Sequence, residues 1–202
     1  ISGLLNGERW PEQWDGLEGG LDFYDAKADV EAVLDRCGVG GEFREAQHPA
    51  LHPGQSALIL VEGKPMGWLG CIHPRVAQKL EIPKKTYLFE LDLDLLHQGK
   101  LPSFQNLSRF PSIRRDLAIV VDVETPVGAL CSRITEAAGE LLADLAVFDI
   151  YQGEGVETGL KSVALGLILQ DSSRTLTDDD VDSVMQAVTG QLEKQFGATL
   201  RE

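Results

Sequence analysis

Long apolar runs, clustered cysteines and an excess of basic residues are all missing from this sequence. Its three cysteines, Cys37, Cys71 and Cys131, form no C-x-x-C pair, and no histidine stands with them at metal-ligand spacing. We therefore expect no metal site and no disulfide framework, because isolated cysteines of this kind are most often small buried side chains. This cysteine usage is typical of a reducing, cytoplasmic environment.

No segment has the pattern of a targeting or membrane signal. A charged stretch followed by a long apolar run is absent, so the sequence predicts neither a secretory signal nor a membrane span, and we expect no membrane partner. The first residue is Ile1. We expect the chain to be a piece of a longer protein.

The shortage of basic residues limits how the chain could bind nucleic acid. Its 32 acidic residues outnumber 18 basic ones, which gives a formal charge of −14. Such a charge argues against binding by bulk electrostatics, so we expect no DNA partner, and any RNA contact should be local. Arg109, Arg114, Arg115, Lys161 and Arg174 fall at predicted strand starts or in loops, and all but Arg109 are candidates for phosphate contacts. Scattered solvated charge is the alternative explanation.

The remaining composition is that of a globular protein. With 43% hydrophobic and 25% charged residues, the 202 residues suffice for one large or two small cores, and two domains is the better expectation. Turn-forming residues interrupt the apolar pattern between 99 and 112. The sequence therefore predicts one domain over residues 1–106 and another over 107–202.

The second domain has a clear succession of strands and helices. Strands are predicted at 117–123, 143–152, 163–169 and 198–201. Helices are predicted from Thr125-Pro126 to Gly139 and from a cap at Thr177 to Gly197. The resulting β-α-β-β-α-β order is that of a ferredoxin-like fold, in which two helices cover one face of a four-stranded antiparallel sheet. The other face stays open to a ligand that the fold alone does not identify.

The first domain is less regular. Residues 25–37 have the pattern of an amphipathic helix ended by Gly38, segments 57–61 and 66–72 flank a turn, and 86–93 alternates as another strand. We expect a mixed α/β layer with an antiparallel sheet whose opening elements are missing. The whole chain is therefore predicted to be of the α+β class.

No catalytic set emerges from the sequence. Three histidines precede prolines, at His48-Pro49, His52-Pro53 and His73-Pro74, and a structural turn is the more frequent role of such a pair. Phe43-Arg44-Glu45 is similar to the arginine signature with which class II synthetases hold ATP. The acid of that signature should stand two residues after the arginine, where this chain has Ala46. We therefore expect no catalytic residue and no ATP chemistry in this chain.

One group of residues has a chemistry that suits RNA. Period-two geometry in the strand places Asp149 and Tyr151 on one face and Phe148 and Ile150 on the other. If the hairpin after this strand closes as expected, Ser162 lies opposite Tyr151. A ring, a carboxylate and a hydroxyl suit a splayed-out base, since guanine offers N1–H and N2 amine donors to a carboxylate. The alternative is an edge tyrosine whose hydroxyl is satisfied by Asp149 or Ser162.

Several motifs along the chain carry a specific resemblance to a known family. In the first domain they are DFYDAKADVE at 22–31, HPG at 52–54, GCIHP at 70–74 and FELD at 89–92. In the second they are FPSIRRDL at 110–117, FDIYQG at 148–153 and RTLTD at 174–178. The first group resembles the non-catalytic, class II-like domain of the bacterial phenylalanyl-tRNA synthetase β subunit. The second group resembles its ferredoxin-fold anticodon-binding domain, so that the resemblance covers essentially the whole chain.

The resemblance implies partners and roles. In that family an α subunit activates phenylalanine with ATP and Mg²⁺ inside an (αβ)₂ assembly, while the β subunit supplies scaffold and tRNA-binding domains. The expected partners are therefore tRNA(Phe) and the α subunit, with no cofactor in this chain itself. By motif, Asp149, Tyr151 and Ser162 correspond to the residues that hold the first anticodon base, a guanine.

Two other functions compete with anticodon reading. The first is a ferredoxin-like module that senses a small molecule and does not bind RNA, which predicts glycine-rich loops before the helices and no exposed aromatic residue on the sheet. The second is an assembly element in which residues 1–100 only dock the α subunit. This second role can coexist with anticodon binding.

Overall fold

The computed structural model describes residues 1–11, 13–14, 19–99 and 108–201. The chain divides into two compact units, Ile1–Phe104 and Gln105–Glu202. Most of the boundary region predicted from the sequence falls on residues 100–107, which lie outside the described residues. Each unit has a hydrophobic core of its own, and the two cores share no residue.

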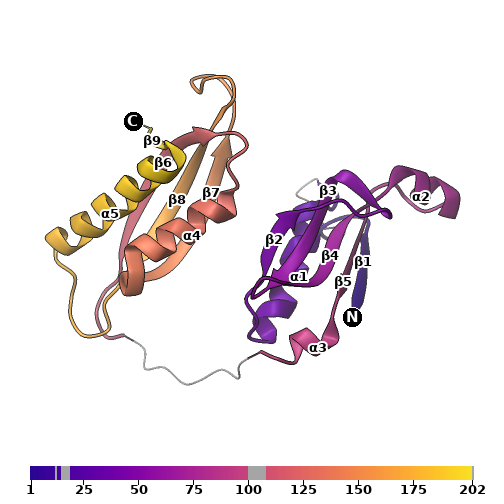
Figure 1. Cartoon of the computed structure of the whole chain (residues 1–202), viewed down its shortest axis with the longest axis horizontal. Coiled ribbons are helices and arrows are strands. Elements are labelled where there is room, and N and C mark those ends of the chain that lie inside the picture. Colours follow the sequence, from indigo (N-terminus) through magenta and orange to yellow (C-terminus); the bar gives the residue numbers. More distant parts are fainter. Residues whose placement is uncertain (12, 15–18, 100–107, 202) are drawn as a thin grey trace. The chain divides into compact units, whose positions relative to one another are not determined.

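The first unit is built on a five-stranded antiparallel sheet in which β1 and β2 form the edges (Figure 1). In spatial order its strands are β1 (Ser2–Asn6), β5 (Thr86–Leu91), β4 (Lys64–Ile72), β3 (Leu51–Val61) and β2 (Glu42–Glu45). The predicted hairpin is confirmed as β3 and β4. Its turn residues Glu62 and Gly63 both have positive φ, which matches the twist of the two strands.

Helix α1 (Phe23–Arg36) covers one face of this sheet. Its buried residues Ala26, Val30 and Leu34 pack in one cluster with sheet residues such as Ile59 and Leu69. The helix begins two residues earlier than predicted, because Asp22 caps it: the Asp22 carboxylate accepts from two backbone N–H groups while the Asp25 carboxylate accepts from the backbone N–H of Asp22. Two short helices, α2 (Pro74–Leu80) and α3 (Leu93–Leu96), follow β4 and β5.

The three His-Pro pairs have structural roles: His48-Pro49 lies at a turn, His52-Pro53 lies in β3, and His73-Pro74 begins α2. In each pair the histidine Nδ1 accepts a hydrogen bond from the backbone N–H two residues later: Ala50 to His48, Gly54 to His52 and Arg75 to His73. His73 thereby caps the start of α2. This use of Nδ1 resembles the way an aspartate side chain closes a turn on its own backbone.

The second unit has the order β6 (Ile113–Asp122), α4 (Val127–Ala138), β7 (Leu142–Tyr151), β8 (Leu160–Leu169), α5 (Asp178–Phe196) and β9 (Thr199–Leu200). A short 3-10 turn, Gly139–Leu141, joins α4 to β7. The sheet is antiparallel with the spatial order β7-β8-β6-β9, so that β7 and β9 are its edges. The predicted ferredoxin-like arrangement and the α+β class are confirmed.

Both helices of this unit lie on the same face of its sheet (Figure 1). Leu130 and Ile134 of α4 and Val181 and Val188 of α5 share one cluster with the alternate, inward-facing residues of β6 and β8. Gly197 ends α5 in the left-handed conformation, as predicted. One prediction was wrong in detail, since Pro126 occupies the cap position of α4 and makes no side-chain cap bond. None of the described helices is long and apolar enough to cross a membrane.

Candidate nucleic-acid interface

The predicted base-binding residues lie together on the uncovered face of the second sheet. Val163 of β8 is fully buried beneath the helices, so its neighbours Ser162 and Ala164 point to the opposite face. Tyr151 pairs with Ser162, as predicted, and Asp149 pairs with Ala164. Because paired residues on adjacent strands share a face, the ring, the carboxylate and the hydroxyl all lie on the open side.

A β-bulge in β7 corrects the predicted position of Phe148. The pairing between β7 and β8 shifts between Val147 and Asp149, which leaves Phe148 as the extra residue. The guanidinium of Arg114 lies against Gly166 on the open face, and its Cζ is 5.6 Å from the centre of the Phe148 ring. Phe148 therefore lies on the open face, whereas strict alternation predicted it on the opposite one.

The ring of Tyr151 is held in place by the hairpin turn that follows it. Its hydroxyl donates to the backbone carbonyl of Glu154 at 3.2 Å. A Cβ at Gly153 would lie 2.6 Å from the same hydroxyl, so the ring occupies space that only glycine leaves free. The hydroxyl is thus satisfied within the domain, as the alternative predicted, but by the carbonyl of Glu154 and not by Asp149 or Ser162. The side chain remains 37% exposed and offers its ring to solvent.

The two polar members of the group differ in access. Asp149 is exposed, and no ion pair between described residues includes it, so its carboxylate is available as an acceptor. Ser162 is only 4% exposed because it lies in the inner strand β8, between Tyr151 on one side and Val120 on the other. Its hydroxyl lies at the base of the site, below the exposed side chains.

Arg201 belongs to the site although no sequence pattern pointed to it. Its backbone N–H donates to the carbonyl of Ala118, which ties the residue after β9 to β6. Its guanidinium Cζ lies 5.4 Å from the centre of the Tyr151 ring. A single basic residue next to the last position of the sequence carries no pattern of its own. Only the pairing of β9 with β6 brings it to this face.

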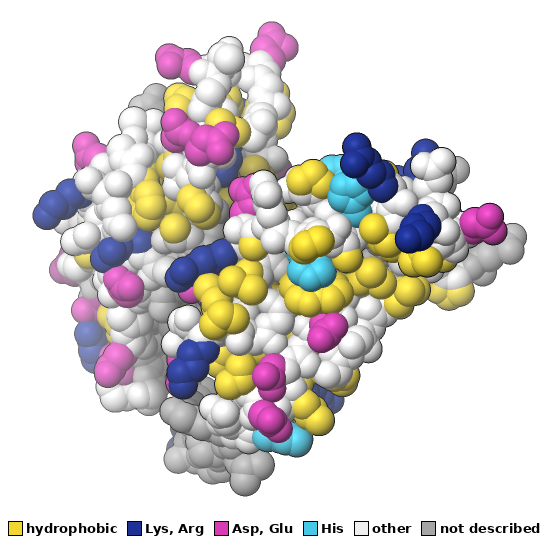
Figure 2. Space-filling model, turned by 45° about the vertical axis from the view of Figure 1, so that its right-hand side comes forward, with side chains coloured by type: hydrophobic (Ala, Val, Ile, Leu, Met, Phe, Trp, Pro, Cys, Tyr) yellow, Lys and Arg dark blue, Asp and Glu magenta, His cyan; other side chains and the backbone are white. Residues whose placement is uncertain are grey.

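Two of the predicted phosphate contacts, Arg114 and Arg115, lie on opposite faces of β6. Arg114 is on the open face, where its Nε donates to Asp116 at 2.8 Å. Arg115 alternates with it and lies on the helix side, 3.9 Å from the Asp178 carboxylate at the start of α5. On the face drawn in Figure 2 the described Lys and Arg side chains stand apart, interspersed with acidic ones.

Lys161, a third predicted phosphate contact, points into the structure. The residue is 8% exposed, and its ammonium group donates to the backbone carbonyls of Val123 and Thr125 at 2.8 and 2.6 Å. These carbonyls belong to the loop between β6 and α4, so the side chain stabilises that loop. The ammonium group has little exposed surface to offer a phosphate.

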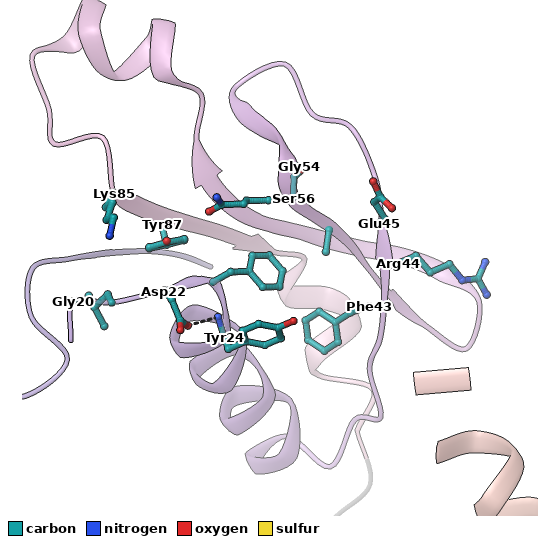
Figure 3. Close-up of a pocket in the computed structure, with 14 residues that line it drawn as sticks. Gly20, Asp22, Tyr24, Phe43, Arg44, Glu45, Gly54, Ser56, Lys85 and Tyr87 are labelled. Carbon is teal, nitrogen blue, oxygen red and sulfur yellow. Dashed lines mark hydrogen bonds between the residues drawn. The ribbon is translucent and has the colours of Figure 1, made fainter. Parts of the chain in front are cut away.

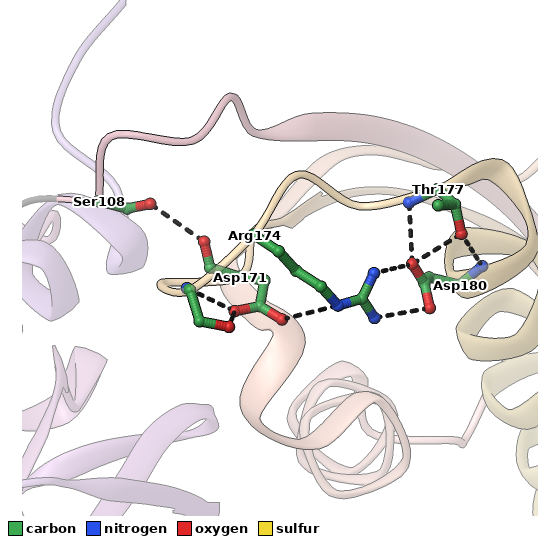
Figure 4. A network of polar contacts seen from close by, with 6 residues as sticks. Ser108, Asp171, Arg174, Thr177 and Asp180 are labelled. Carbon is green, nitrogen blue, oxygen red and sulfur yellow. Dashed lines mark hydrogen bonds and ion pairs between the residues drawn. The ribbon is translucent and has the colours of Figure 1, made fainter.

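Arg174, the fourth, is engaged by two acidic residues (Figure 4). Its guanidinium donates to both carboxylate oxygens of Asp180 at 2.5 and 2.8 Å and lies 3.7 Å from Asp171. Asp180 also accepts from the N–H and hydroxyl of Thr177. The Arg174 guanidinium, followed by the Thr177 donors, holds the pKa of Asp180 well below its ordinary value. This network caps and stabilises the N-terminus of α5.

The first unit contains a cavity of about 680 Å³ beside the start of α1 (Figure 3). Aromatic residues of α1, β2 and β5 line it, among them Tyr24, Phe43 and Tyr87. Asp22 in its wall is occupied as the cap of α1, and Arg44 is bound through two nitrogens by Glu42. Figure 3 shows the Arg44 side chain directed away from the rings. The ion pair of Arg44 lies within its own strand and is more than half exposed.

Two family models match the chain, and each corresponds to one of the two units. Residues 108–201 match the model described as "Ferredoxin-fold anticodon binding domain". Residues 1–93 match the model described as "Phenylalanyl tRNA synthetase beta chain CLM domain". The first description agrees with the β-α-β-β-α-β topology found in the second unit.

Curated proteins named "Phenylalanine--tRNA ligase beta subunit" are similar over the entire chain. Those of Pseudomonas syringae and Methylococcus capsulatus are each 47% identical, and that of Hahella chejuensis is 44% identical. The alignments cover 100% of this chain but only 25–26% of the relatives, so the chain spans about a quarter of their length. On the strength of these matches, the chain belongs to the phenylalanine–tRNA ligase β-subunit family.

Proposed function

We propose that this chain is the part of a phenylalanine–tRNA ligase β subunit that recognises the anticodon of tRNA(Phe). The observation that carries the proposal is the exposed ring of Tyr151 beside the exposed carboxylate of Asp149, on the open face of a sheet that matches an anticodon-binding family. A site of this kind reads one unstacked base, which needs no large basic surface.

The chemistry assigns a role to each residue. The base stacks on the Tyr151 ring, which contributes about 1–3 kcal/mol. Asp149 accepts from the N1–H and N2 amine of guanine, and these two donors together distinguish guanine from the other bases. Ser162, at the base of the site, offers its hydroxyl to a base edge that enters between the surrounding side chains.

Among the candidates for phosphate contacts, the geometry supports Arg114, to which we add Arg201. Both guanidinium groups lie on the open face beside an exposed ring. We leave out Lys161 because its buried ammonium group is bound to two carbonyls, Arg174 because two carboxylates hold its guanidinium, and Arg115 because it lies on the helix side. Contacts of this kind to phosphate oxygens position a nucleic acid without reading its sequence.

The remaining partners follow from the family and not from the site. The proposal places the chain in the cytoplasm, in an (αβ)₂ enzyme whose α subunit uses ATP and Mg²⁺ to attach phenylalanine to tRNA. The first unit would then serve as scaffold toward the α subunit. A small-molecule sensor is the weaker alternative, since it predicts no exposed aromatic residue on the sheet, where Phe148 and Tyr151 are 54% and 37% exposed.

Binding of the chain to anticodon stem-loops tests the proposal. We expect a stem-loop of tRNA(Phe) to bind at least tenfold more tightly than one in which adenine replaces only the first anticodon base. Tyr151→Ala should weaken binding of the natural stem-loop about 5- to 100-fold, as loss of one stacked base predicts, with the thermal unfolding of the chain unchanged. Equal affinity of both stem-loops for the wild-type chain would contradict anticodon reading.

A further inference from the structure

Phe148 is an exposed aromatic residue that takes no part in the proposed binding of one guanine. Its side chain is 54% exposed, more than that of any other residue of β7 with a large hydrophobic side chain. The bulge at this position turns the ring to the open face, and a bulge commonly serves to redirect a side chain next to a functional site. A large apolar ring turned to solvent costs free energy unless something covers it.

Arg114 is held next to this ring before any ligand arrives. Its Nε donates to Asp116 at 2.8 Å, and its guanidinium passes over Gly166, where a Cβ would approach Nη2 to 3.1 Å. With Cζ 5.6 Å from the Phe148 ring centre, ring and guanidinium form a pair. Tyr151 and Arg201 form the same kind of pair on the same face.

We propose that Phe148, with Arg114 beside it, is a second stacking site, which takes the nucleobase of a nucleotide adjacent to the one held by Tyr151 and Asp149. The inference rests on the proposed function. Phe148 and Tyr151 are three positions apart along the strand, a rise of about 10 Å, which a splayed single strand spans between neighbouring nucleotides. A positive charge beside each ring suits a strand with one phosphate per nucleotide.

This second site should tolerate any base, in contrast to the first. Asp116, the carboxylate on this part of the face, is bound to Arg114 and so is less available as a base-edge acceptor than Asp149. Stacking alone discriminates weakly, since every base has a π-face. The expected ligand is therefore an unpaired nucleotide with any base, next to a guanine.

The test uses the full chain and a set of anticodon stem-loops in which each loop nucleotide in turn lacks its base. Phe148→Ala should weaken binding of the intact stem-loop about 5- to 100-fold. Phe148→Ala and the wild-type chain should bind with equal affinity to one stem-loop only, in which the missing base is next to the first anticodon base. Replacing this base by any other should change the affinity of the wild-type chain less than about threefold.

A matched control is Ile150→Ala. Ile150 is 49% exposed on the same strand, but it pairs with the buried Val163 and so points to the helix side, as predicted from the sequence. This variant should bind all stem-loops as the wild type does. Circular dichroism and thermal unfolding should be the same for both variants.

The outcomes separate the two proposals. If Phe148→Ala weakens every stem-loop equally, or none, while Tyr151→Ala still removes the preference for guanine, the second site is wrong and the first stands. If neither substitution affects any stem-loop, anticodon reading itself is wrong, and the second site falls with it. A partner protein on Phe148 would likewise leave all RNA affinities unchanged and overturn the inference.

Discussion

The ring of Tyr151 is positioned by contacts outside the hydrophobic core. These contacts are the carbonyl of Glu154, the space left by Gly153 and the guanidinium of Arg201. Asp149, its neighbour in the site, is exposed as well. Substitution of either residue removes little buried surface, so recognition and folding should be separable at this site.

Lys161, in contrast, is buried and bound within the fold. A substitution should therefore separate its structural role from the phosphate contact predicted from the sequence. Lys161→Met leaves the carbonyls of Val123 and Thr125 without their charged donor. We expect a loss of about 1.5–3 kcal/mol in the free energy of unfolding, measured with urea, and unchanged RNA affinity under native conditions. Lys194→Met, which changes an exposed lysine of α5, is the control. Unaltered stability with reduced RNA affinity would restore the phosphate contact.

For single residues, the sequence correctly predicted the side-chain directions that follow from strand alternation. It did not predict those that depend on a bulge or on burial. Asp149, Tyr151 and Ser162 share a face because a period of two and one hairpin pairing suffice to place them. Phe148 was placed on the wrong face because the extra residue of a bulge interrupts that period. The direction of the Lys161 side chain depends on a loop 36–38 residues away in the sequence, which no local pattern contains.

Among the elements, α5 has the most elaborate beginning. Thr177 and Asp180 form a reciprocal capping box, and Arg174 binds the same carboxylate through two nitrogens. Asp178 and Asp179 add negative charge at the positive end of the helix dipole. Arg174, a candidate phosphate contact predicted from the sequence, thus helps to begin a helix whose buried residues complete the core of the second unit.

This network predicts a pH dependence of stability. The pKa of Asp180 is lowered in the folded chain from an ordinary value of 3.8, so its contribution is fully present above that value and is lost as the pH falls through the folded pKa. Asp180→Asn should therefore reduce the free energy of unfolding at pH 7, and the difference from wild type should shrink below about pH 4. Urea unfolding at pH 7 and pH 3 measures it. Asp182→Asn, on an exposed position of α5, should show no such change, and a pH-independent effect of Asp180→Asn would contradict the assignment.

Most of the elements that the sequence predicted are long ones with a period of their own; the exception is the two-residue strand β9, which was expected after the end of α5 at Gly197. Both helices of the second unit and its first three strands have alternating or helical apolar patterns, and so does the β3–β4 hairpin. The edge strands β1 and β2 were missed, because strands of five and four residues with mostly exposed side chains carry too few apolar positions to show a period. Pairing with β5 and β3 forms them.

Over the whole molecule, the formal charge of −14 opposes the approach of RNA. Recognition must then depend on short-range stacking and hydrogen bonds, with two guanidinium groups near phosphates. We expect the logarithm of the binding constant to fall with the logarithm of salt concentration with a slope of about −1.4, from about −0.7 per phosphate contact. Fluorescence titrations of the stem-loop between low and physiological salt measure this slope, and a value steeper than about −4 would contradict a local interface.

A comparison of guanine with inosine at the first anticodon position tests whether Asp149 reads the base. Inosine lacks the N2 amine, so one of the two donors for Asp149 is lost while the stacked base remains. The wild-type chain should bind the inosine stem-loop about tenfold more weakly, whereas Asp149→Ala should bind both stem-loops equally. If the Asp149→Ala chain kept the full preference for guanine, the carboxylate would not be reading the base.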